Sequence, residues 1–276
     1  MIQKISSEQE DFWSQNPCGG ESEFARRTWL KYAKEPWISL LHKEIVKRHR
    51  RILEIGFGQG VDAYHLAALL PKDGEYIGID YSKESIVRAE QSRTEAAAFL
   101  SELANHSFEL GDAQDLRFED STQECVYSIG VLHHTADPKK AVKEVFRVLE
   151  PNGTAYIALY ARPSIKVGIA KILRGFQWSI DQVLGRERSI YGALKDRKLP
   201  WFFGTMLHEC FGVQWIWWFS RREICELFSS FHEVEISRVG YNLPFVHYSR
   251  NGKTPLGYFW LITARKPAND AQLQNQ

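Results

Sequence analysis

The stretch RILEIGFGQG, residues 51–60, constrains the fold more than any other part of the sequence. RILEI is a mostly apolar run of strand length, and it passes directly into a turn with glycine at every second position. Such a run is typical of a strand buried in a sheet, and glycine lets a ligand approach the backbone closely. The stretch therefore predicts a buried strand that ends beside a bound molecule.

Strand and helix patterns alternate from this turn to residue 160. After the first strand, the expected strands are EYIGID, HSFEL, CVYSIG and TAYIALY. Helical patterns separate several of them, and such alternation predicts a parallel sheet with crossover helices. HEVEISRVG and LGYFWLITARK add a final hairpin-like pair. The predicted fold class is α/β, a Rossmann-like open sheet that is mostly parallel with an antiparallel last strand, with helices on both faces and a helical lid insertion.

For two of the helices, the sequence also predicts where the helix begins or ends. Pro138 fits the first position of a helix whose apolar stripe extends to Leu149, and Pro151-Asn152-Gly153 is expected to end it. Ser220, followed three residues later by Glu223, forms a capping-box pattern. This pattern predicts that a second helix begins directly after Ser220.

The same patterns divide the chain into parts. The expected parts are a helical segment over 1–50 that closes the ligand site, an α/β core over 51–160 and 220–266, a helical, aromatic and basic lid insertion over 161–219, and a disordered tail over 267–276. The first segment has helical spacing with a break at Pro36, because proline removes a helix donor. The insertion is distinguished by the lack of a clear strand pattern.

The spacing of the glycines narrows the choice of ligand. Gly56, Gly58 and Gly60 follow the pattern G-x-G-x-G, whereas a dinucleotide fingerprint would place a third small residue at Val61. A β-branched side chain fits poorly where that helix must pack closely. The Lys and Ser or Thr of a phosphate-binding P-loop are also missing from this turn. The pattern is evidence against a nicotinamide or flavin dinucleotide as the ligand, and it favours a ligand without a pyrophosphate.

Acidic residues follow the next two strands of the predicted sheet. Asp80 closes the strand YIGID, and Asp112 follows the strand HSFEL. Ligands in open α/β sheets bind at the carboxyl ends of the strands, where a carboxylate can accept hydrogen bonds from ribose hydroxyls. We therefore expect the glycine turn, Asp80 and Asp112 to lie on one rim.

The order and spacing of these motifs resemble the class I S-adenosylmethionine-dependent methyltransferases of the small-molecule "methyltransferase domain" type. The resemblance covers residues 51–160. It is carried by LEIGFGQG, GIDYS, GDAQDL, SIGVLHHTADP and FRVLEPNGTAYIALY, and less specifically by WFSRREICELFSSF and NPCG. It implies S-adenosylmethionine as the cofactor and no metal.

The resemblance also implies a set of cofactor-binding residues. They are Glu54, Gly56, Gly58, Gly60, Asp80, Tyr81, Asp112, Ala113 and Gly130. The three glycines of the turn would face the methionine part of the cofactor, with Gly130 nearby. Asp80 would accept from the ribose hydroxyls and Asp112 from the adenine amine. Glu54 matches a position that supports the loop more often than it touches the cofactor.

A catalytic base is needed only if the methyl acceptor carries a proton, and histidine is the usual choice near neutral pH. His133 and His134 follow the fourth strand at the same rim, so we consider them as the catalytic residues, with His134 slightly preferred. The alternative is a structural or pocket-lining role for the pair. Tyr160, His208 and His247 are further candidates.

The insertion is expected to meet the acceptor. Residues 161–222 hold eleven Lys or Arg against four Asp or Glu, together with many aromatic residues. A basic, aromatic lid suits a planar or hydrophobic acceptor with an acidic group. Alternatively, the aromatic residues form the lid's own core and the charges its solvated face. A third interpretation is that IKVGIAKILRGFQWSI is a basic amphipathic helix that touches an anionic membrane.

The sequence thus predicts a methyltransferase acting on a small molecule that is hydrophobic or aromatic, or anionic, with oxygen preferred over nitrogen or carbon as the methylated atom. A formal net charge of +1 argues against a nucleic-acid partner. Four scattered cysteines without zinc-ligand spacing, and no targeting segment, favour a cytoplasmic protein, with transient membrane contact a lesser expectation. The alternatives are a nicotinamide-dependent oxidoreductase and a non-catalytic cofactor-binding scaffold.

Overall fold

The computed structural model describes residues 12–15, 23–100, 102–195, 208–213, 215–240, 254 and 257–268. The strands are β1 (Arg51–Ile55), β2 (Glu75–Asp80), β3 (Asn105–Leu110), β4 (Gln123–Ile129), β5 (Leu149–Tyr160), β6 (His232–Val239) and β7 (Phe259–Arg265). The helices are α2 (Phe24–Lys34), α3 (Pro36–Arg48), α4 (Val61–Leu69), α5 (Lys83–Leu100), α6 (Pro138–Val148), α7 (Ile165–Leu184), α8 (Ser189–Leu194) and α10 (Arg221–Leu227), with short turns η1 (Leu132–His134) and η2 (His208–Gly212).

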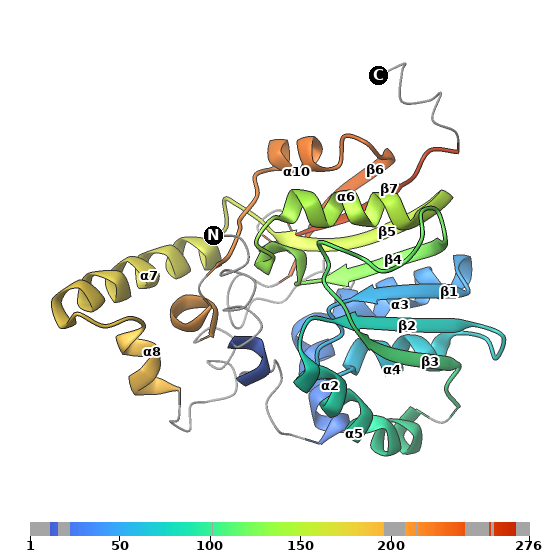
Figure 1. Ribbon diagram of the computed structural model, residues 1–276, viewed down its shortest axis with the longest axis horizontal. Coiled ribbons are helices and arrows are strands. Elements are labelled where there is room, and N and C mark those ends of the chain that lie inside the picture. The colour runs from blue at the N-terminus through green and yellow to red at the C-terminus, as the bar shows by residue number, and fades with distance from the viewer. Residues whose placement is uncertain are drawn as a thin grey trace.

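The strands form one seven-stranded sheet in the order β3-β2-β1-β4-β5-β7-β6 (Figure 1). The first five strands of the chain pair in parallel, whereas β7 is antiparallel to both β5 and β6. The predicted mostly parallel sheet with an antiparallel last strand is therefore confirmed. Because β1 to β5 are parallel, their carboxyl ends share one edge of the sheet, which we call the rim.

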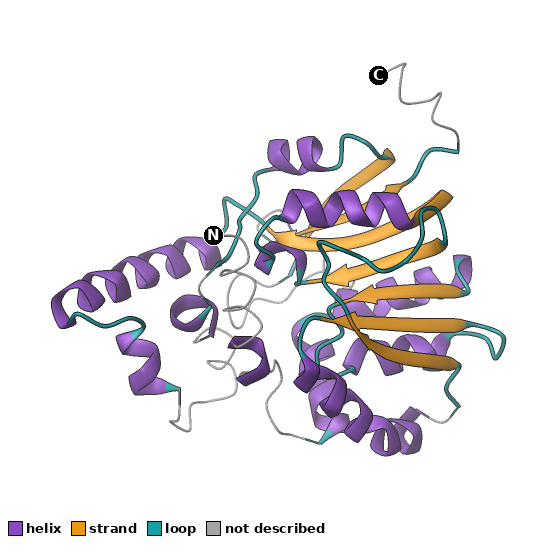
Figure 2. Ribbon diagram, in the orientation of Figure 1, coloured by secondary structure: helices purple, strands orange, loops and turns teal. Residues whose placement is uncertain are grey.

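Helices cover both faces of the sheet, as predicted (Figure 2). Leu53 in β1 points toward a core formed with α6 and α10, and its neighbour Ile52 points toward a core formed with α3, α4 and α5. Successive side chains of a strand point to opposite faces, so a strand covered on both sides must be apolar along most of its length. This explains why RILEI carries an apolar side chain on each face.

The helix ends follow the local sequence signals. The Asp137 side chain accepts the Lys140 backbone N–H at 3.0 Å and caps α6. Ser220 and Glu223 form a complete capping box at the start of α10. Pro36 is the first residue of α3, where its missing N–H leaves no helical hydrogen bond unmade. The predicted break at Pro36 and the predicted start of α10 are both confirmed.

The end of α6 differs from the prediction. The helix ends at Val148, and Leu149 pairs with Gln123 as the first residue of β5. Asn152 has a left-handed φ of 66°, and the pairing of β5 with β4 shifts register nearby. Leu149 therefore belongs to the strand, and Pro151-Asn152-Gly153 forms an irregularity within β5 rather than a stop after the helix.

The insertion leaves and rejoins the sheet at one point. Ala161 and Phe219 form a parallel bridge, in which the Phe219 N–H donates to the Tyr160 carbonyl at 2.9 Å and the Arg162 N–H donates to the Phe219 carbonyl at 2.8 Å. Between these ends lie α7, α8 and η2, together with a stretch outside the described residues. The 20-residue helix α7 extends away from the sheet (Figure 1).

Candidate functional site

The glycine turn at the end of β1 has the backbone that its sequence requires. Gly56 and Gly58 have φ of 82° and 56°, in the left-handed region that favours glycine. A Cβ on Gly56 would lie 2.3 Å from Cγ2 of Val131, so the turn packs tightly against the end of β4. A Cβ on Gly58 would meet nothing within 4 Å. The backbone at Gly58 therefore borders open space at the rim.

Asp80 at the end of β2 is hydrogen-bonded to this turn. Its Oδ2 accepts the Gly58 N–H at 2.9 Å, and its Oδ1 accepts the Ser82 N–H at 2.9 Å. Burial raises the pKa of the Asp80 carboxyl, and the two N–H donors oppose that rise. The Ser85 side chain and the Tyr81 N–H also favour the charged form, so donors from the glycine turn and from the start of α5 both hold this carboxylate in place.

Asp112 follows β3 beside Asp80, because the Gly111 N–H donates to the Asp80 carbonyl at 2.9 Å. The Asp112 Oδ1 accepts from the backbone and the side chain of Gln114, at 2.8 and 3.2 Å. Ala113 is buried next to it, whereas Tyr81 is half-buried. The two acidic residues and the glycine turn are therefore brought to one rim, as the spacing predicted.

Gly130 and Glu54, two further predicted cofactor residues, differ in where they lie. Gly130 follows β4 with φ of 78°, and its N–H donates to the Ala158 carbonyl at 3.1 Å. Glu54 lies in the interior, where it accepts the Tyr76 hydroxyl at 2.5 Å. Burial, followed by the charge of Asp62, raises the pKa of Glu54 to about 8. Glu54 is therefore placed beneath the turn as a neutral carboxyl at neutral pH.

A buried polar cluster supports the glycine turn from below. Asp62, in the first turn of α4, is only 1% exposed and pairs with Lys31 at 2.7 Å. It also accepts the hydroxyls of Tyr32 and Tyr127, at 3.1 and 2.8 Å. Burial alone would raise the pKa of Asp62, but the nearby cations, led by Lys31, lower it to about 2. His42 joins the cluster through the Tyr127 hydroxyl at 2.9 Å.

No local sequence pattern predicts this cluster. Its one visible signal is Asp62, an acidic residue in the otherwise apolar helical pattern VDAYHLAALL. The partners come from α2, α3 and β4, which are far apart in the sequence. The cluster therefore fixes both N-terminal helices to the segment that begins at the glycine turn.

The two candidate histidines occupy different environments at the end of β4. His133 is fully buried and stacks on Tyr160, with ring centroids 3.8 Å apart. Within the part of the chain that the structure describes, neither ring nitrogen of His133 has a hydrogen-bond partner. Burial, aided by His134, lowers the pKa of His133 well below its ordinary value. His134 is only partly buried and contacts Trp13, with ring centroids 5.2 Å apart.

A small cavity lies next to Tyr160, on the side of the insertion. Tyr160, Lys166, Val167, Ala170, Ile216, Trp218 and Tyr258 line it. The Lys166 Nζ is 3.8 Å from the ring centre of Tyr258 and 5.6 Å from that of Tyr160. The cavity thus combines aromatic walls with one cation, beside the buried ring of His133. The side chain of His208 and the whole of His247 lie outside the described residues.

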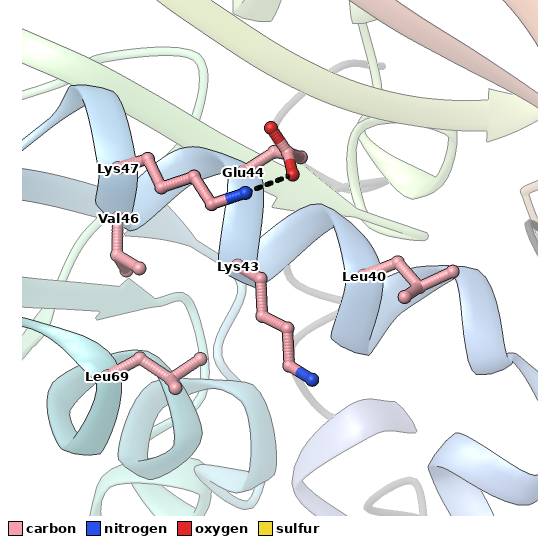
Figure 3. Close-up of a pocket in the computed structure, with 6 residues that line it drawn as sticks. All are labelled: Leu40, Lys43, Glu44, Val46, Lys47 and Leu69. Carbon is pink, nitrogen blue, oxygen red and sulfur yellow. Dashed lines mark hydrogen bonds and ion pairs between the residues drawn. The ribbon is translucent and has the colours of Figure 1, made fainter.

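A wider pocket lies at the opposite end of the sheet. Figure 3 shows it between α3 and α4, lined by Leu40, Lys43, Glu44, Val46, Lys47 and Leu69. Leu69 is the last residue of α4, whereas the glycine turn precedes the first residue of that helix. The pocket is therefore remote from the rim. Among the described residues, no group of three or more His, Cys, Asp or Glu is placed to hold a metal ion.

The fold is a Rossmann-like open sheet, a class in which ligands bind at the carboxyl ends of the strands. A family described as "Methyltransferase domain" matches residues 46–175, which include β1 to β5, the glycine turn and both acidic residues. These residues form a class I S-adenosylmethionine-dependent methyltransferase domain, and S-adenosylmethionine is the cofactor of that class.

Individual relatives agree with this classification. An uncharacterized methyltransferase of Schizosaccharomyces pombe is 37% identical over 109 residues, which are 39% of either chain. Tocopherol O-methyltransferase of Arabidopsis thaliana is 31% identical over 126 residues, 46% of this chain and 34% of that protein. The structure of the YcgJ protein of Bacillus subtilis superimposes with a TM-score of 0.55 at 18% identity, covering 85% of this chain and 99% of that one. The chain spans less than half the length of either curated relative.

Proposed function

We propose that this chain is an S-adenosylmethionine-dependent methyltransferase that transfers a methyl group to a small-molecule acceptor. The observation that carries this proposal is the hydrogen bond from Gly58 to Asp80, where backbone that borders open space meets a buried carboxylate at the rim. A ribose presents two adjacent hydroxyls, which such a carboxylate can accept. The cofactor, when bound, supplies a methyl group on a positively charged sulfur.

The residues of the rim would act mainly by positioning. Correct orientation of two reactants can supply on the order of 7 to 11 kcal/mol of a barrier. Gly56, Gly58 and Gly60 would leave room for the methionine part of the cofactor, and Asp112 would accept from the adenine amine. The match of residues 46–175 to a methyltransferase domain supports these assignments.

We further propose that the acceptor binds at the small cavity, next to the stacked rings of Tyr160 and His133. An unpaired buried ring nitrogen costs about 1–3 kcal/mol, and a polar group of the acceptor would remove that cost. His133 is neutral, because its pKa lies below the ordinary value, so one nitrogen can accept a hydrogen bond from a hydroxyl. This favours an oxygen acceptor on a hydrophobic or aromatic molecule.

The N-terminal segment 1–50 and the insertion 161–219 would close this site. The Ser14 hydroxyl is 2.9 Å from the Ser82 hydroxyl beside Asp80, and Trp13 contacts His134 at the end of β4. Residues 12–15 therefore reach both ends of the rim. Exclusion of water by such an element strengthens the electrostatic interactions inside the site.

Calorimetric titration tests the cofactor. We expect heat from S-adenosylmethionine and none from NAD, and heat from NAD alone would instead support a nicotinamide-dependent oxidoreductase. Binding without any methyl transfer would favour a non-catalytic scaffold. A screen for transfer of a radiolabelled methyl group to metabolite extracts identifies the acceptor.

None of the described cysteines forms a disulfide, which agrees with the cytoplasmic location that we propose.

Two matched variants test the histidines once an acceptor is known. His133→Phe keeps the ring stacked on Tyr160 and removes both nitrogens, so turnover should fall by about 100-fold or more if His133 contacts the reacting hydroxyl. His134→Phe should retain most of the activity. The reverse result would assign the role to His134, and full activity in both variants would show that neither ring acts on the acceptor.

A further inference from the structure

The outward face of α7 is apolar along most of its length. Ile165, Ile169, Ile172, Phe176 and Val183 recur at intervals of three, four and seven residues, which places them on one side of a helix. We call this set the α7 stripe. Three of its members, Ile172, Phe176 and Val183, are 74%, 60% and 85% exposed. No described element covers them.

The inward face of the same helix is partly polar. The Gln177 side chain donates to the Phe211 carbonyl at 2.7 Å, and Arg174 donates to the Val213 carbonyl at 2.6 Å. In an ordinary surface helix the apolar stripe faces the core and the polar residues face water. In α7 the buried face combines Val167 and Ala170 with the polar Gln177, while large apolar side chains face outward. Contiguous exposed apolar surface of this kind marks an interaction site.

The charge around α7 indicates which partner fits. Residues 161–195 carry seven Lys or Arg and two Asp or Glu, a net charge of +5, whereas the whole chain carries +1. The one acidic residue within α7, Asp181, accepts the backbone N–H groups of Arg188 and Ser189 at 2.8 Å each. Arg162 pairs with Glu223, and Lys166 and Arg174 face inward, over Tyr258 and to the Val213 carbonyl. The cations that can flank the stripe are therefore Lys171, Arg186, Arg188 and Lys195, while the chain outside 161–195 has a net charge of −4.

We propose that the α7 stripe is a docking surface for an anionic lipid membrane, with α7 lying flat in the headgroup region. An amphipathic helix with basic flanks binds in this way, because apolar side chains enter the acyl boundary and Lys and Arg face anionic headgroups. A second copy of the chain is a poorer occupant, since two surfaces of the same positive charge would face each other. None of the described helices is long and apolar enough to cross a bilayer, which leaves a flat orientation for α7.

Sedimentation with vesicles tests the proposal on the full chain. The probe is a vesicle of equal parts phosphatidylcholine and phosphatidylglycerol, compared with one of phosphatidylcholine alone. We expect wild-type protein to bind the anionic vesicles more tightly, and high salt to weaken that binding. The double variant Ile172→Asp, Phe176→Asp should lower the partition coefficient by about tenfold or more, because both large side chains would be lost from the interface.

The matched control is Leu40→Asp, Val87→Asp, which adds the same charge at two exposed apolar positions outside α7, 41% and 47% exposed. This control should change the partition coefficient by less than about twofold. Circular dichroism verifies that both double variants are folded. The proposal is overturned if wild-type protein does not bind the anionic vesicles, or if the two double variants bind equally well. It is also overturned if light scattering finds a dimer that only the stripe variant dissociates.

Discussion

Replacement of Asp80 by alanine tests the proposed cofactor site most directly. The carboxylate accepts the N–H groups of Gly58 and Ser82, and each hydrogen bond to a charged group is worth about 1.5–3 kcal/mol. Alanine would leave these donors unpaired at the glycine turn and would remove the acceptor for the ribose hydroxyls. Loss of one ribose hydrogen bond of this strength raises the dissociation constant for S-adenosylmethionine roughly ten- to a hundredfold.

Asp80→Asn provides a control of the same shape. Its amide keeps one acceptor oxygen but brings an NH₂ group toward a backbone donor, so its affinity should fall between those of wild type and Asp80→Ala. Titration calorimetry measures the dissociation constant, and urea denaturation of the same samples reports whether the variants are folded. Folded variants that bind with the wild-type dissociation constant would refute the assignment of Asp80 to the cofactor.

The pH dependence of the same titration provides an independent check. Burial raises the pKa of Asp80, so its carboxylate is protonated at a higher pH than an exposed aspartate would be. A protonated carboxyl has lost acceptor capacity, and the wild-type affinity should fall as the pH falls through this raised pKa. The Asp80→Asn variant should lack that dependence.

Three further predictions concern stability. The pKa of Glu54 is raised by burial from 4.5 to about 8, so the stability that its proton contributes is present below 4.5 and is lost as the pH rises toward 8. Glu54→Gln should flatten that loss in thermal unfolding measured across this pH range. Gly56→Ala should destabilise the fold by more than about 1 kcal/mol in urea, because its Cβ would clash with Val131 and its φ is left-handed. Gly168→Ala, where an added Cβ meets nothing within 4 Å, should be neutral or stabilising. Tyr127→Phe should cost about 1–3 kcal/mol of unfolding free energy, because a buried carboxylate loses a donor. An unchanged urea midpoint in Gly56→Ala or Tyr127→Phe would contradict the respective packing or hydrogen-bond argument.

The sheet could be predicted because its signals are local. The runs RILEI and EYIGID carry both the apolar content of buried strands and the residues that follow them at the rim. The capping box at Ser220 likewise depends on two residues only three positions apart. Leu149 was assigned to the wrong element because an apolar residue at helical spacing fits a helix and a buried strand equally well.

The details of the site depend on contacts between distant segments. His133 and His134 are adjacent and identical in type, yet only His133 is stacked beneath Tyr160, because the end of β5 covers one ring and not the other. The partners of Asp62 similarly come from helices and a strand that no local pattern relates. Sequence patterns therefore place residues at the rim, whereas tertiary packing determines their protonation and exposure.

The bridge between Ala161 and Phe219 affects how freely the length of the insertion can change. Because sheet-type hydrogen bonds already hold the two ends of the insertion side by side, its length is largely independent of the geometry of the sheet. Each doubling of a flexible loop costs only about 0.6 kcal/mol in closure entropy. The segment between these residues can therefore differ in length without a change in the sheet or in its rim.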